Sequence, residues 1–146
     1  MMNLKRASVI GFVIAALALG TLVFQESLFA TGLVAITVQI LAALLMVWAR
    51  VTFGQRSFHA AADPTEGGLV TSGPYKFLRH PIYAAVLYFI WAGVLSHPLR
   101  INFFLGVVAT AGLVVRMLAE ERLVTQRYPD YTAYSARTKR IIPFII

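Results

Sequence analysis

The chain has 146 residues, of which 59% are hydrophobic and only 13% are charged. Soluble domains carry about 25% charged residues, so this composition is typical of a membrane protein, and the length is that of one domain. The absence of cysteine excludes disulfides, thiolate nucleophiles and cysteine-ligated metals.

The first two apolar segments predict membrane-spanning helices. Residues 7–24 carry no charge, and residues 28–49 have Gln39 as their only strongly polar residue. Helices of about 18–22 residues cover roughly 27–33 Å, which is enough to cross a hydrocarbon core of about 30 Å. Small residues suit close helix packing and predict a scaffold role for these spans; they are Gly11, Ala15, Ala16, Gly20 and Gly32.

The loop predicted over residues 50–80 is too long for a simple connector, and loops of this length are usually functional or disordered. Its stretch GGLVTSGPY, residues 67–75, places β-branched residues between turn formers and predicts an ordered extended segment. Pro81 follows at the start of a helix, where a missing N–H group costs nothing. Arg79 and His80 are therefore predicted at the positive, N-terminal end of the third helix.

The third and fourth apolar segments, residues 81–96 and 101–119, predict a helical hairpin. The break SHPLR, residues 96–100, reads as a tight turn between them. The apolar run of the third segment, residues 82–96, is marginal for a membrane span at about 22 Å, unless Pro81 and the residues before it extend it. We predict an all-α integral membrane protein with four transmembrane helices in a single membrane domain, residues 1–146.

The polar segment over residues 120–146 begins abruptly with Glu120 and Glu121. Pro129 and Asp130 suit the start of a short helix. Three tyrosines recur along one side of it at three-residue spacing, namely Tyr128, Tyr131 and Tyr134. The segment is predicted to be an amphipathic helix, and by themselves its tyrosines would suit headgroup depth at the membrane surface.

The basic residues predict the orientation of the four helices. With the N-terminus in the cytoplasm, two Lys and Arg residues precede the first helix, four lie in the loop over residues 50–80, and six lie near or after the end of the fourth helix. Only Arg100 falls on the opposite side. This positive-inside pattern predicts a multi-pass protein of a prokaryotic inner or plasma membrane with both termini in the cytoplasm. It explains the net charge of +7 without nucleic acid, for which no binding motif is present.

The hairpin brings two groups of polar residues to one membrane face, because the start of the third helix lies beside the end of the fourth. The groups are Arg79, His80 and Tyr83 on one helix and Arg116, Glu120 and Glu121 on the other. Consecutive helical residues point about 100° apart, so the two glutamates face different partners, and Arg116 is near enough to pair with Glu120. A carboxylate at membrane depth is usually functional, whereas a solvated helix end with salt bridges is the plain alternative.

A metal site is a competing interpretation of a histidine beside two glutamates. These three residues make a thin set of ligands, His97 falls at the opposite membrane face, and the chain has no His-x-x-x-His pair. No metal is therefore predicted. The sequence also has no Gly-x-Ser-x-Gly elbow, no glycine-rich phosphate loop and no Rossmann fingerprint.

Three stretches of sequence carry a resemblance to a known family. LVTSGPYKFLRHPIY, residues 69–83, is followed by the hairpin and by EERL, residues 120–123. Together with the tail RYPDYTAYSARTKRIIPFI, residues 127–145, it resembles the isoprenylcysteine carboxyl methyltransferase family. Related membrane methyltransferases that act on phospholipid amines share the Arg-His-Pro and Glu-Glu features. The chain departs from the pattern at Ala85, where the family often has Gly, and in the tail, where Tyr-Pro replaces a common Phe-Gly.

The resemblance implies that S-adenosylmethionine binds at the cytoplasmic face and that a lipophilic acceptor enters from the surrounding membrane lipids. Carried over by position, the cofactor-binding residues are Leu69, Val70, Tyr75, His80, Tyr83 and Glu120. The residues assigned to catalysis, which would lie nearer the acceptor or organise the pocket, are Arg79, Glu121 and Arg137.

The chemistry of these side chains is consistent with that cofactor. Its carboxylate needs a cation or N–H donors, which Arg79, His80 and the helix N-terminus offer, and Glu120 can take its ammonium group or ribose hydroxyls. A short chain has little cytoplasmic structure to recognise a protein, so we expect an isoprenylcysteine-type carboxylate or similar small lipid as acceptor. The alternatives are N-methylation of a phospholipid amine, with Glu121 taking the proton, and a scaffold that retains the fold without turnover.

Overall fold

The computed structural model describes residues 2–54 and 68–143. They form five α-helices and one 3₁₀ helix and contain no strand: α1 (Met2–Phe24), α2 (Leu33–Phe53), η2 (Gly73–Lys76), α3 (Pro81–Ser96), α4 (Arg100–Arg127) and α5 (Tyr131–Arg137). The predicted all-α fold class is therefore confirmed. The parts of the predicted loop and C-terminal segment at residues 55–67 and 144–146 lie outside the described residues.

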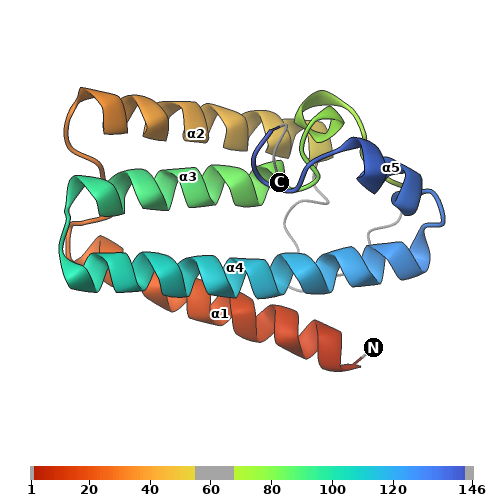
Figure 1. The fold of residues 1–146 in the computed structure, drawn as a ribbon, viewed down its shortest axis with the longest axis horizontal. Helices are drawn as coiled ribbons and strands as arrows, with labels where there is room; N and C mark the ends of the chain where they lie inside the picture. Colours follow the sequence, from red (N-terminus) through yellow and green to blue (C-terminus); the bar gives the residue numbers. More distant parts are fainter. Residues whose placement is uncertain (1, 55–67, 144–146) are drawn as a thin grey trace.

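The four long helices run in alternating directions (Figure 1). The start of α1, the end of α2, the start of α3 and the end of α4 share one end of the molecule with η2 and α5, and we call it the polar end. The opposite end contains the loop between α1 and α2 and the turn between α3 and α4. Because α3 and α4 are antiparallel, the first turn of one faces the last turns of the other.

The ends of the helices follow local sequence signals to different degrees. α3 occupies the range of the predicted third segment, because Pro81 opens it and a His-Pro pair follows Ser96. α2 begins only at Leu33, because Gly32 has a φ of 84° that interrupts a helix. α4 continues past the predicted end at residue 119 to Arg127, because the polar residues that follow are good helix formers.

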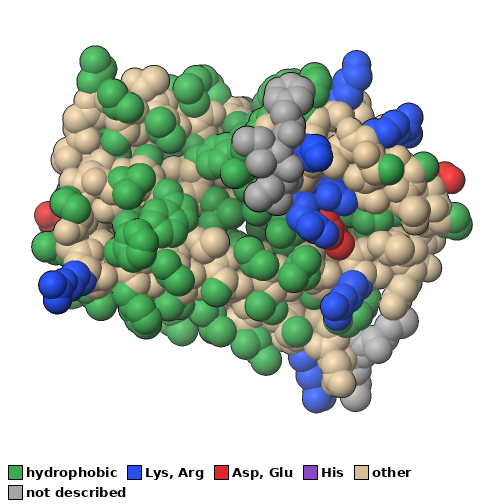
Figure 2. Space-filling view, in the orientation of Figure 1, with side chains coloured by type: hydrophobic (Ala, Val, Ile, Leu, Met, Phe, Trp, Pro, Cys, Tyr) green, Lys and Arg blue, Asp and Glu red, His purple; other side chains and the backbone are tan. Residues whose placement is uncertain are grey.

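Among the described residues, three helices are long and apolar enough to cross a membrane: α1, α2 and α4. α3 has 16 residues and is shorter, so the span predicted there stays a prediction. α4 is about 42 Å long, which exceeds the hydrocarbon core and leaves room for its last turns outside it. Figure 2 shows hydrophobic side chains over much of the surface, while most of the visible Lys and Arg side chains lie toward the polar end.

α1 packs on α4 through small residues. A Cβ atom on Gly11 would lie 2.5 Å from the backbone oxygen of Gly112, and a Cβ atom on Gly112 would lie 3.2 Å from the Cβ atom of Ala15. The two backbones therefore approach closely, which confirms the predicted packing role of Gly11 and Ala15. Gly20 differs, because a Cβ atom there would meet nothing within 4 Å in the described part of the chain.

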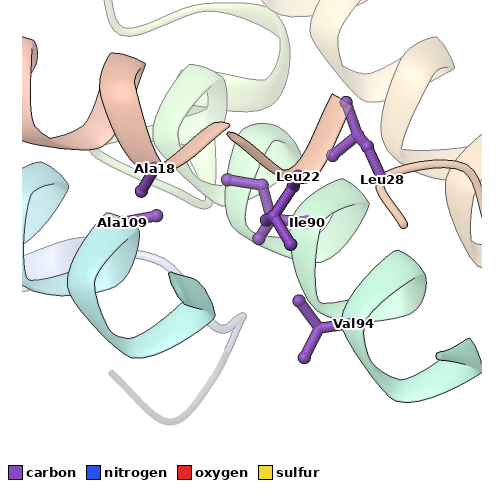
Figure 3. Packing of buried hydrophobic residues seen from close by; sticks show 6 residues of the cluster. All are labelled: Ala18, Leu22, Leu28, Ile90, Val94 and Ala109. Carbon is purple, nitrogen blue, oxygen red and sulfur yellow. The ribbon is translucent and has the colours of Figure 1, made fainter. Parts of the chain in front are cut away.

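A buried apolar cluster joins α1, α3, α4 and the loop that follows α1. Its members are Ala18, Leu22, Leu28, Ile90, Val94 and Ala109. Figure 3 shows the side chains of Leu22 and Ile90 close together and those of Ala18 and Ala109 facing each other. α1 thus contacts both α3 and α4 and holds the two helices of the hairpin in place.

Candidate functional site

The chain enters α3 through η2, which packs against the end of α2. Gly73 opens this turn with a φ of 54°, in the left-handed region that favours glycine. Tyr75 is buried, and its ring centre lies 5.4 Å from that of Phe53. Burial raises the pKa of Tyr75, so its phenol is neutral at physiological pH. Leu69 and Val70 precede the turn and are half-buried, in a segment without regular secondary structure.

Residues 138–141, which we call the C-terminal strap, run beside the residues that lead into α3. The N–H group of Lys139 donates to the carbonyl of Phe77 at 3.0 Å. The N–H group of Arg79 donates to the carbonyl of Lys139 at 2.6 Å, and that of His80 donates to the carbonyl of Arg140 at 3.1 Å. These bonds satisfy backbone groups just before the helix and fix the path of Arg79 and His80.

The tyrosines of α5 fasten this part of the chain to η2 and α3. Tyr131 and Tyr134 are buried, and the Tyr134 hydroxyl donates to the backbone carbonyl of Tyr75 at 2.7 Å. Burial raises the pKa of Tyr134 to about 12. The Tyr88 hydroxyl of α3 donates to the carbonyl of Ile141 at 2.6 Å. The tyrosine side of α5 therefore packs on the protein.

Glu121 is a buried carboxylate surrounded by basic side chains from two other segments. Arg140 donates to Oε2 from Nε at 3.1 Å and from Nη2 at 3.0 Å. His80 Nε2 lies 3.2 Å from Oε1, and Arg79 Nε lies 3.7 Å from the same oxygen. The hydrogen bond to Glu121 raises the pKa of Arg140. Two guanidinium groups and an imidazole thus meet at one carboxylate.

Glu120 faces a different partner on α3. The Tyr83 hydroxyl donates to Glu120 Oε2 at 2.6 Å, and Arg116 Nε donates to the Tyr83 oxygen at 2.8 Å. Tyr83 therefore bridges Arg116 and Glu120, which spacing along α4 alone could not show. The rings of His80 and Tyr83 are 5.4 Å apart, so the surroundings of the two glutamates adjoin.

The structure brings most of the predicted site residues together at the polar end, namely Arg79, His80, Tyr83, Glu120 and Glu121. Arg137 lies apart from them. It is exposed, and its Nε donates to the carbonyl of Ala133 in its own helix at 3.3 Å. Arg140 contacts Glu121 in its place. Sequence reasoning missed Arg140, because the spacing of residues in the C-terminal segment does not indicate which arginine contacts Glu121.

The donor groups of the site, two guanidinium groups and an imidazole beside a carboxylate, suit the binding of an anionic group. Arg79 Nε is buried and makes no hydrogen bond with the described residues, so a donor is left for an acceptor group. Within residues 2–54 and 68–143, no three His, Asp or Glu side chains are grouped to hold a metal ion. His59 lies outside the described residues, and His97 lies in the turn at the opposite end, with Nδ1 3.1 Å from the carbonyl of Gly93.

Comparison with known proteins gives two matches. The family model described as the isoprenylcysteine carboxyl methyltransferase (ICMT) family matches residues 33–126, from the start of α2 nearly to the end of α4. The chain is also 29% identical over 76 residues to the cobalt-zinc-cadmium resistance protein CzcN of Cupriavidus metallidurans. That match covers 51% of this chain and 35% of the relative, so the chain spans about a third of the relative's length. No solved structure matches significantly.

Proposed function

Because the chain belongs to the isoprenylcysteine carboxyl methyltransferase family, we propose that it is an S-adenosylmethionine-dependent methyltransferase that acts on a lipophilic acceptor at the cytoplasmic face of a membrane. The observation that carries the proposal is that Glu121, which is buried, and Glu120, which is half-buried, bond to side chains at the start of α3. All of these residues lie within the matched segment.

The residues at the polar end fit the parts of this cofactor. His80, at the N-terminus of α3, would hold the amino-acid carboxylate, and Arg79, whose Nε makes no hydrogen bond with the described residues, would lie nearer the acceptor. Glu120 would accept from the ammonium group or the ribose hydroxyls. Tyr75, with Leu69 and Val70 before it, offers an aromatic and apolar wall. When bound, S-adenosylmethionine supplies a methyl group on a sulfonium, and a carboxylate acceptor takes that group without losing a proton.

The charges around Glu121 favour a carboxylate acceptor. Arg79 and Arg140 place two guanidinium groups against the single negative charge of Glu121, so the cluster has positive charge to spare for an anion. No general base is needed, because the acceptor is already ionised, and the chain mainly has to align the two reactants. We therefore propose O-methylation of an isoprenylcysteine-type or similar lipid carboxylate.

Two alternatives use the same fold. N-methylation of a phospholipid amine would require Glu121 to take up the amine proton, although both of its oxygens already accept hydrogen bonds from basic side chains. A scaffold without turnover would tolerate substitution of the whole cluster. We rank both below the carboxyl methyltransferase, because an amine acceptor needs a free base and a scaffold has no use for the clustered basic groups.

Binding of the cofactor product tests the proposal. We expect calorimetry on the detergent-solubilised protein to detect S-adenosylhomocysteine binding by the wild type, with at least about tenfold weaker binding by His80→Ala and Glu120→Ala. His97→Ala at the opposite end is the matched control and should bind as the wild type does. Absence of binding by the wild type, or undiminished binding by both site variants, would refute the proposal.

Methyl transfer to defined acceptors separates the alternatives. Membranes that contain the protein would receive methyl-labelled S-adenosylmethionine with either an S-prenylated cysteine that has a free carboxylate or phosphatidylethanolamine. A methyl ester releases labelled methanol in mild base, whereas a methylated amine does not. Base-labile label on the prenylated cysteine supports the proposal, base-stable label on the lipid supports amine methylation, and no label supports the scaffold.

The proposed orientation has both termini in the cytoplasm. It is supported by the gathering of Lys and Arg side chains toward the polar end, which holds the start of α1 and α5 (Figures 1 and 2). It also requires α3 to complete a fourth crossing. Reporter fusions after the C-terminus should therefore act as cytoplasmic proteins do, and fusions in the α3–α4 turn as exported ones. The reverse pattern would exclude this orientation.

A further inference from the structure

An open apolar cavity lies at the α3–α4 turn, at the opposite end of the molecule from the candidate site (Figure 1). Its volume is about 320 Å³. Binding sites for small molecules have volumes of about 300–1,000 Å³, so the cavity is large enough for part of a ligand. It is lined by residues from the end of α3, the turn and the start of α4, namely Val94, Leu95, Pro98, Leu99, Arg100 and Phe103. The side chains of Leu95, Leu99 and Phe103 are more than half exposed, so the cavity opens at the surface of the protein.

Arg100 is the one charged residue among those that line the cavity. It is exposed, and no carboxylate of the described residues forms an ion pair with it. Arg100 is also the first residue of α4, and Leu99 before it provides no side-chain hydrogen bond to the helix end. The positive end of the helix dipole therefore adds to the charge of the guanidinium group. An apolar cavity with this charge beside it suits a ligand that joins a hydrocarbon chain to an anionic group.

The membrane itself supplies such a ligand at the depth of the turn. With α3 as the fourth crossing, its 16 residues cover about 24 Å, which is less than a hydrocarbon core of about 30 Å. The α3–α4 turn then lies close to the boundary between acyl chains and headgroups. An arginine at that depth keeps its hydrocarbon stem among apolar groups and extends its guanidinium group to the lipid phosphates. The cavity therefore faces phospholipid rather than water.

From these observations we propose that the cavity binds one anionic phospholipid of the membrane leaflet around the turn. The phosphate bonds to Arg100, and the start of one acyl chain lies along Leu95, Leu99 and Phe103. A free phosphate ion fits less well, because every lining residue except Arg100 is apolar. The bound lipid fixes the depth of the α3–α4 turn in the membrane. This inference does not depend on methyl transfer, and its membrane depth rests on the proposed crossing by α3.

Trp91 is a reporter for this cavity, because its ring centre lies 5.3 Å from that of Phe103. The Trp48→Phe variant keeps Trp91 as its single tryptophan. This variant would be reconstituted in phosphatidylcholine vesicles in which an increasing fraction of the lipid has brominated acyl chains, which quench tryptophan fluorescence. We expect brominated phosphatidylglycerol to give half-maximal quenching at about a fivefold lower mole fraction than brominated phosphatidylcholine, the preference expected for one basic residue beside an anionic lipid.

Substitutions at the cavity and away from it locate the bound lipid. Arg100→Gln in the same variant should remove the preference, so that both brominated lipids quench Trp91 equally. Arg122→Gln is the matched control and should leave the preference unchanged, because Arg122 is exposed on the same helix at the polar end. Leu95→Asn places a polar amide in the cavity and should weaken quenching by both lipids about twofold. Inorganic phosphate should not relieve the quenching, because it has no chain to fill the cavity.

Four results would overturn the inference. If the preference for phosphatidylglycerol persists in Arg100→Gln, the basic protein as a whole attracts anionic lipid and this cavity does not. If Leu95→Asn changes nothing, no acyl chain lies in the cavity, and if inorganic phosphate relieves the quenching, the site binds a free anion. If neither brominated lipid quenches Trp91, protein covers the cavity, and cross-linking through Leu99→Cys would show whether a second copy does so. Binding of S-adenosylhomocysteine, which tests the proposed function, is independent of all four results.

Discussion

The molecule buries polar side chains at both ends but satisfies them in different ways. At the opposite end, Gln39 donates to the backbone carbonyls of Leu28 and Phe89 at 2.8 and 3.0 Å and accepts from the N–H group of Ala30 at 2.9 Å. All three partners are backbone groups, and the side chain is neutral. At the polar end, Glu121 is ionised and bonds to other ionisable side chains.

This difference separates polar groups that hold the fold from polar groups that are available for chemistry. Backbone partners cannot move without loosening the loop and helices that carry them, so Gln39 fastens the α1–α2 loop to α3. Charged side chains can exchange partners when a ligand arrives, and burying them costs stability that a neutral group would not cost. Clusters of this second kind are typical of functional sites.

Of the substitutions proposed here, Glu121→Gln should lower methyl transfer the most. The change leaves Arg79 and Arg140 without the negative charge that balances them, while the shape of the side chain is kept. We expect methyl transfer to fall at least about 100-fold, as when a charge that organises a transition state is removed. The thermal midpoint should fall as well, because two guanidinium groups lose their counter-charge, so activity is compared per amount of folded protein. Glu26→Gln, on the exposed loop after α1, is the control, and near-normal activity of Glu121→Gln would contradict the assignment.

Gln39→Leu tests the opposite end. The change leaves three backbone groups without their partner, so we expect the free energy of unfolding to fall by about 2–3 kcal/mol. Protein that remains folded should bind S-adenosylhomocysteine within about twofold of the wild type, because the site is distant. Thr37→Val is the control, since this exposed hydroxyl bonds only within its own helix. If Gln39→Leu instead weakened S-adenosylhomocysteine binding and left the free energy of unfolding unchanged, the distinction between the two ends would be wrong.

The sequence predicts the helices well where their ends carry local signals. Pro81 and the His-Pro break mark both ends of α3, so its range was predictable. The end of α4 was not, because the change from apolar to polar residues after residue 119 marks a change of surroundings rather than the end of a helix. A left-handed glycine, Gly32, decides the start of α2, and its conformation depends on the fold of the loop before it.

The site was predictable only where the topology alone places residues of two neighbouring helices side by side. An antiparallel hairpin with a short turn places the start of α3 beside Glu120 and Glu121. The contact of Arg140 depends on backbone pairing between distant segments, for which the tail has no periodic signal. The contact of Ser8 with Arg116 depends on the rotation of α1, and a helix that is apolar all round does not specify its rotation.

Arg140→Gln should have a moderate effect, because its side chain is 39% exposed and it is one of several partners of Glu121. We expect kcat/KM to fall about threefold to tenfold, the usual effect of losing one partly exposed charged hydrogen bond. The family resemblance places Arg137 among the catalytic residues, but the Arg137 side chain bonds within its own helix. Arg137→Gln should therefore have the smaller effect, and Lys139→Gln is the exposed control in the strap. A larger loss at Arg137 would favour the assignment by resemblance.

Alkaline pH should loosen the polar end before the opposite end, because all six tyrosines lie between residues 75 and 134 and none lies in the loop after α1 or the α3–α4 turn. Burial raises the pKa of Tyr134 to about 12, above the value of 10.0 for an exposed phenol. Between these two pKa values the Tyr134 phenol is deprotonated in the unfolded chain but still protonated in the folded chain. Stability is therefore fully present below about pH 10 and decreases as the pH rises toward 12.

The two tryptophans report on this difference in one experiment. A Cβ atom on Gly73 would lie 3.2 Å from Trp48 Nε1, so Trp48 reports on η2 at the polar end. Trp91 Nε1 donates to the Thr110 hydroxyl on α4 at 3.0 Å, so Trp91 reports on the α3–α4 pair nearer the opposite end. The Trp91→Phe variant keeps only Trp48, and the Trp48→Phe variant keeps only Trp91. We expect the fluorescence of Trp48 to change at lower pH than that of Trp91. Simultaneous changes would mean that the two ends respond to pH as one unit, and a Trp91 change at the lower pH would reverse the comparison.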